Sequence, residues 1–166
     1  MKEGRFFILF LLMLTAQILV SNYLNFSQLL LINILPALIL CVPTRIKGYW
    51  LLIIAFATAF LADFFAGGML GLTATALLPA ALLRNGIIRL VFGDELFSRQ
   101  EDISVARQGV LKASFAILLI LSVFFIIFIW VDAAGTRPFW FLLLKFFLSL
   151  LASYLVSLLV VETLNP

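Results

Sequence analysis

The sequence predicts an all-α integral membrane protein, on the evidence of its composition and of the spacing of its polar residues. Hydrophobic residues make up 65% of the 166 residues and charged residues only 11%, and the mean hydropathy is +1.25. Soluble domains of this size do not have such a composition. Short polar stretches divide the chain into six candidate spans, which we assign to one polytopic membrane domain covering residues 1–166.

The candidate spans follow one another closely in the first half of the chain. We place them at about residues 6–24, 29–42, 49–66, 69–83, 113–131 and 139–161, with a cytoplasmic segment at 84–112. The second span is short for a hydrocarbon core of roughly 30 Å. It also contains Pro36, so we expect a packed, irregular helix there. The segment 84–112 fits either a helical extension of the fourth span at the interface or a solvated loop.

The distribution of basic residues predicts the orientation of these spans. With the N-terminus inside, nine Lys and Arg residues fall in the inside segments, whereas the outside loops hold only Arg137. Cytoplasmic segments of membrane proteins carry an excess of Lys and Arg. We therefore expect both termini to be cytoplasmic.

The third span carries small residues on one helical face and ends in a glycine cluster. Small residues allow the close backbone approach that drives helix association in lipid. We therefore expect this face to receive another helix, either the sixth span or a partner helix, and the glycines to permit a tight turn. The residues are Ala55, Ala59, Ala62, Ala66, Gly67, Gly68 and Gly71.

Two ionisable residues lie within the candidate spans, Asp63 in the third and Lys145 in the sixth. A charge inside a membrane is costly and is expected to have a partner. Their depths match, so we predict a direct ion pair, which is either purely structural or lines a substrate or proton path. The sixth span continues with a polar intramembrane face of Ser149, Ser153 and Ser157 at intervals of four, which we expect to pack against the third span.

The sequence lacks the common signatures of enzymes. It contains no histidine and one cysteine, Cys41, which we expect to be a small buried residue. No G-x-S-x-G, H-E-x-x-H, Walker or C-x-x-C pattern occurs. We therefore expect no catalytic residues, no metal and no cofactor, and nothing indicates binding to nucleic acid.

The chain resembles the MreD family of rod shape-determining membrane proteins, most closely the forms found in the Bacteroidetes. The similar stretches are Ala16–Val20 followed by Asn22, then Pro43, and then Phe56–Leu72 with Asp63 before the glycines. Arg84 and the mixed-charge segment before the fifth span are also similar. Members of the family often have a glycine shortly before the aspartate, where this chain has alanines.

The resemblance implies a fold and a function. The fold would be a six-helix bundle related to the substrate-binding subunits of energy-coupling-factor transporters. The function would be that of a non-enzymatic subunit of the cell-elongation complex (elongasome) in the bacterial inner membrane. It would bind the single-span protein MreC and link the MreB filament to peptidoglycan synthesis by a penicillin-binding transpeptidase and a glycosyltransferase. The alternative is a subunit of a membrane transporter that binds a vitamin or another small molecule.

Overall fold

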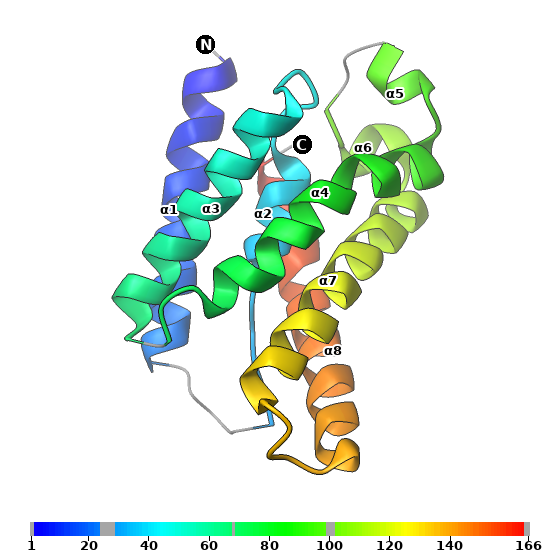
Figure 1. Ribbon diagram of the computed structural model, residues 1–166. Coiled ribbons are helices and arrows are strands. Elements are labelled where there is room, and N and C mark those ends of the chain that lie inside the picture. The colour runs from blue at the N-terminus through cyan, green and yellow to red at the C-terminus, as the bar shows by residue number, and fades with distance from the viewer. Residues whose placement is uncertain (1, 24–28, 68, 99–101, 165–166) are drawn as a thin grey trace.

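The computed structural model describes residues 2–23, 29–67, 69–98 and 102–164, which form helices and no β-strand (Figure 1). Five helices are long and apolar enough to cross a membrane. They are α1 (Lys2–Tyr23), α3 (Gly48–Ala66), α4 (Leu72–Phe92), α7 (Val110–Ala133) and α8 (Phe139–Leu164). The other three, α2 (Leu35–Cys41), α5 (Glu95–Ser98) and α6 (Val105–Gln108), are short. The prediction of a multi-span all-α membrane protein is confirmed.

The second predicted span, residues 29–42, is not a membrane-spanning helix, and here the prediction is corrected. Residues 31–34 have no regular secondary structure, and α2 contains only seven residues. Pro36 explains the start of α2, because proline has no N–H and is favoured in the first turn of a helix, where that N–H would have no partner. Pro43 explains its end, because the residue before a proline avoids the helical region, and Val42 is extended at φ −55° and ψ 135°.

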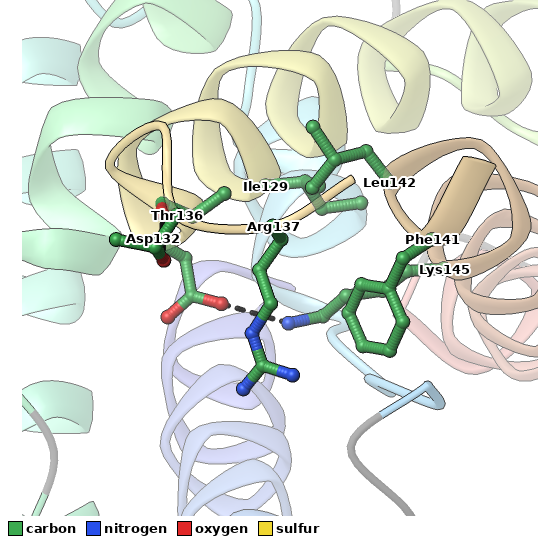
Figure 2. Close-up of a pocket in the computed structure, with 8 residues that line it drawn as sticks. Ile129, Asp132, Thr136, Arg137, Phe141, Leu142 and Lys145 are labelled. Atoms are coloured by element: carbon green, nitrogen blue, oxygen red, sulfur yellow. Dashed lines mark hydrogen bonds and ion pairs between the residues drawn. The ribbon is translucent and has the colours of Figure 1, made fainter. Parts of the chain in front are cut away.

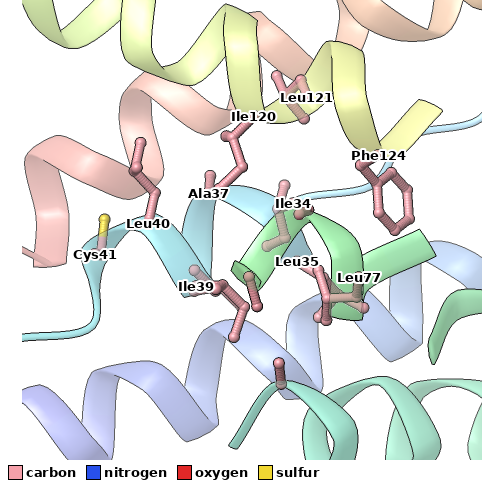
Figure 3. Packing of buried hydrophobic residues seen from close by; sticks show 14 of the residues in the cluster. Ile34, Leu35, Ala37, Ile39, Leu40, Cys41, Leu77, Ile120, Leu121 and Phe124 are labelled. Atoms are coloured by element: carbon pink, nitrogen blue, oxygen red, sulfur yellow. The ribbon is translucent and has the colours of Figure 1, made fainter. Parts of the chain in front are cut away.

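The short helix α2 lies at the centre of the bundle. All seven of its residues are buried, and it contacts α1, α3, α4, α7 and α8. Figure 3 shows its apolar side chains between Leu77 of α4 and the α7 residues Ile120, Leu121 and Phe124. Cys41, the last residue of α2, is buried as expected. The other extensive contacts are those of α4 with α7, of α3 with α4 and of α7 with α8.

The chain passes through the bundle so that the start of α1 and the end of α8 lie at the same end (Figure 1). The α2–α3 turn, α5 and α6 lie at this end, which we call the terminal end. The α3–α4 and α7–α8 turns lie at the other end, which we call the opposite end. The extended residues and α2 together run from the opposite end towards the terminal end, so this irregular segment makes a crossing that the five long helices do not.

The fourth span continues well beyond its predicted end at residue 83. Helix α4 runs to Phe92 and stops at Gly93, whose φ of 80° is a conformation that favours glycine. Of the two interpretations of segment 84–112, the structure therefore has the helical extension, followed by α5 and α6. Arg89 forms an exposed salt bridge of 3.4 Å with Asp94 just after this helix end.

Candidate functional site

The extended residues before α2 are held by side chains from helices on either side of them. The Gln17 amide of α1 donates to the Ile32 carbonyl at 3.1 Å and accepts from the Ile34 N–H at 3.0 Å. Non-helical backbone at membrane depth is tolerated only where its polar groups are bonded within the protein. Gln17, which is 2% exposed, performs this role for two backbone groups at once.

The serine face of α8 bonds the same extended residues. The Ser149 hydroxyl accepts from the Leu31 N–H at 2.9 Å, and the Ser153 hydroxyl accepts from the Asn33 N–H at 3.0 Å. Both serines are fully buried, as is Ser157. The Ser157 hydroxyl has no hydrogen-bond partner among the described residues. The predicted polar face therefore lies inside the bundle, but it contacts the extended segment, whereas α3 packs against α4, α1 and α2.

The C-terminal end of α2 is bound by Arg84, the first residue of the predicted cytoplasmic segment 84–112. Arg84 is 1% exposed. Its guanidinium donates to the Leu40 carbonyl from Nε at 3.3 Å and from Nη2 at 3.2 Å, and also to the Val42 carbonyl. The Leu40 carbonyl belongs to the last turn of α2 and the Val42 carbonyl follows it directly. Carbonyls at a helix C-terminus lack intrahelical donors and carry partial negative charge. The feature of the sequence that could have indicated the burial of Arg84 is an arginine without a nearby acidic residue in the apolar run 72–92.

Asp63 binds the start of α4 and forms no ion pair with Lys145, so the predicted pair is wrong. Its Oδ2 accepts from the N–H groups of Gly71 at 2.9 Å and Thr73 at 3.0 Å. These are unpaired donors at a helix N-terminus, where negative charge is favourable. The turn that brings them to Asp63 uses left-handed backbone at Gly67 and Gly71, with φ of 64° and 91°. The partners of this buried carboxylate are therefore backbone N–H groups and not a cationic side chain.

Lys145 instead pairs with Asp132 at the end of α7, over a distance of 2.7 Å. The pair lies in a cavity of about 320 Å³ at the opposite end of the bundle. Figure 2 shows the side chains that surround it, with Arg137 beside the pair and stacked on the Phe141 ring at 4.9 Å. The prediction failed because equal depth does not specify the direction in which a side chain leaves its helix.

The small-residue face of α3 is used within the chain. Ala55 and Ala59 are fully buried and Ala62 is 7% exposed. The prediction that this face receives a partner helix is therefore corrected for these three alanines, which are covered by the chain's own helices. Only Ala66, Gly67 and Gly71 remain partly or fully accessible. Gly68 lies outside the described residues.

Within the described residues, no three His, Cys, Asp or Glu side chains gather in one place. A scan against protein-family models and searches of curated proteins and solved structures found no match to this chain. The expected likeness to the energy-coupling-factor subunits therefore remains a prediction.

Proposed function

We propose that this protein is a non-enzymatic scaffold of the MreD type in the bacterial inner membrane. It would bind a single-span protein of the MreC type. Through that partner it would link the MreB filament to the penicillin-binding transpeptidase and glycosyltransferase that synthesise peptidoglycan. Both termini would be cytoplasmic. The resemblance of residues 16–20, 56–72 and Arg84 to that family motivates the proposal.

One observation supports a scaffold over a transporter subunit, namely the use of the buried polar side chains. Gln17, Asp63, Arg84 and Ser153 are all bonded to backbone groups of the chain itself. A subunit that bound its substrate in the core of the bundle would need these core side chains to converge on a cavity and remain available to a ligand. Here those groups fix an irregular segment and two helix ends, which favours a rigid bundle that presents its outer faces to other proteins.

The outer faces of the bundle are suited to helices in the lipid plane. Helix α3 exposes a stacked aromatic row, in which the Phe56 and Phe60 rings lie 6.0 Å apart and the Phe60 and Phe64 rings 6.5 Å apart. Helix α8 exposes large apolar residues on the side away from its serines, among them Leu151 and Leu155. A partner helix would bind such faces by close packing, since lipid provides no hydrophobic driving force between helices.

The proposal is tested by removing the gene from a rod-shaped host. We expect the cells to become round, and we expect the tagged protein to copurify with the MreC-type protein of that host. Photo-crosslinkers at the exposed positions Leu11, Phe60 and Leu151, on α1, α3 and α8, should identify the helix that the partner contacts. Normal rods in the deletion strain would refute the scaffold function. Loss of uptake of a small molecule with unchanged shape would support the transporter alternative.

A further inference from the structure

The cavity between α7 and α8 is the one place described above where charged side chains surround open space. Its charged lining consists of Asp132, Arg137 and Lys145, two cations and one carboxylate, so the formal net charge is +1. The remaining polar and apolar lining includes Thr136 and Phe141. A volume of about 320 Å³ is at the lower end of the range for small-molecule sites. The cavity therefore suits a small anionic group.

Lys145 has hydrogen-bonding capacity that the described protein atoms do not use. An ammonium group has three donor hydrogens. The described residues supply one acceptor, Asp132 Oδ2 at 2.7 Å. The Lys145 side chain is only 13% exposed, so the remaining donors are largely shielded from bulk solvent, yet they border the cavity. An anionic oxygen in the cavity would satisfy them.

Arg137 supplies the second cation from the α7–α8 turn. Its guanidinium lies 4.9 Å from the centre of the Phe141 ring, and Arg137 and Lys145 both line the cavity (Figure 2). Guanidinium groups bind phosphate oxygens in a planar, bidentate geometry that leaves the stacking face free. Arg137 and Lys145 can therefore bind one phosphate group between them, with Asp132 setting the position of Lys145.

The level of the cavity in the membrane points to the source of that phosphate. Trp130 near the end of α7 and Trp140 at the start of α8 are 72% and 77% exposed. Exposed tryptophans mark the boundary between hydrocarbon and lipid headgroups, and Asp132 and Arg137 lie between them in the chain. We propose that this cavity binds the phosphate of an anionic phospholipid headgroup at the membrane surface. The proposal does not depend on the scaffold function.

Native mass spectrometry of the full chain in detergent tests the proposal, with phosphatidylglycerol, phosphatidylethanolamine and diacylglycerol as probes. The site has net positive charge, so we expect the strongest binding to phosphatidylglycerol and the weakest to diacylglycerol, which has no phosphate. Arg137→Gln should weaken phosphatidylglycerol binding about tenfold, the value of one charge-assisted hydrogen bond. Arg107→Gln is the matched control, because it removes one exposed arginine from α6 at the terminal end.

Asp132→Asn tests the proposal with a substitution that is expected to strengthen phosphatidylglycerol binding. Loss of this carboxylate makes the cavity more positive, so phosphatidylglycerol binding should strengthen, whereas general damage to the turn would weaken it. Soluble glycerol phosphate that competes as well as the lipid would support the site and assign its phosphate to a soluble source. Equal binding of phosphatidylglycerol and diacylglycerol would overturn the proposal, as would equal effects of Arg137→Gln and Arg107→Gln.

Discussion

At the scale of single residues, two buried charges act on helix termini rather than on each other. Asp63 accepts from two N–H groups at the start of α4, and Arg84 donates to carbonyls at the end of α2. Each charge is placed at the helix end of opposite partial charge. Asp63 therefore ties α3 to the start of α4, and Arg84 ties α4 to the end of α2, which is an architectural role.

We predict that the hydrogen-bonding geometry of Asp63 matters more than its charge. Asp63→Ala leaves two backbone donors without an acceptor and should lower the free energy of unfolding by roughly 2–3 kcal/mol. Asp63→Asn keeps an acceptor oxygen and should lower it by much less. The measurement is SDS-induced unfolding in detergent micelles. Asp94→Ala, which removes an exposed partner of Arg89, should change it by less than about 1 kcal/mol. Equal losses for Asp63→Asn and Asp63→Ala would contradict this account.

The sequence could show that Asp63 and Lys145 need partners, but not which partners they have. The cost of a charge in the membrane predicts a partner for each. The depth of a residue along its helix limits which partners are possible, but it does not give the direction in which the side chain points. A sequence also does not show which backbone N–H groups are available as donors. Lys145 pairs with Asp132, which is only 13 residues away and lies just beyond the predicted end of the fifth span at residue 131. The burial of Arg84 depends on the position of α2, which the sequence does not show.

At the scale of elements, the irregular crossing before α2 accounts for three polar residues that the sequence presents separately. Gln17, Ser149 and Ser153 come from opposite ends of the chain and bond one stretch of backbone. The spacing of the serines predicted a face turned away from lipid, and Pro36 predicted an irregular span. The sequence did not predict that residues 31–34 lack regular secondary structure, because their mostly apolar composition suits a helix equally well.

We predict that Ser153 stabilises this crossing and that Ser157 does not. Ser153→Ala removes the acceptor of the Asn33 N–H and the donor to the Leu31 carbonyl, which should lower the free energy of unfolding by about 1–2 kcal/mol. Ser157→Ala removes an equally buried hydroxyl that has no partner among the described residues, so stability should be unchanged or increased. The same SDS titration compares the pair. A larger loss for Ser157→Ala would show that the hydrogen bonds to the extended segment are unimportant.

At the scale of the whole molecule, the number of crossings determines where the termini lie. Five crossings would place the termini on opposite sides of the membrane, and six place them on the same side. The five long helices supply five crossings, so the segment formed by residues 29–34 and α2 decides between these outcomes. The sequence predicts six spans from hydropathy and charge. Figure 1 shows the irregular segment and α2 running between the two ends of the bundle, as a sixth crossing of the membrane would require.

We predict that single cysteines at Arg5 and Glu162, both exposed near the two termini, are shielded from a membrane-impermeant maleimide in intact cells. A cysteine at Thr136, in the exposed α7–α8 turn, should react. The background is Cys41→Ala, which removes the only native thiol. Asp94→Cys, just beyond α4, should react only after permeabilisation, because the Lys and Arg excess places that end in the cytoplasm.

Reaction at only one of Arg5 and Glu162 would mean that the irregular segment does not cross. Reaction at both, with Thr136 protected, would keep six crossings and reverse the orientation.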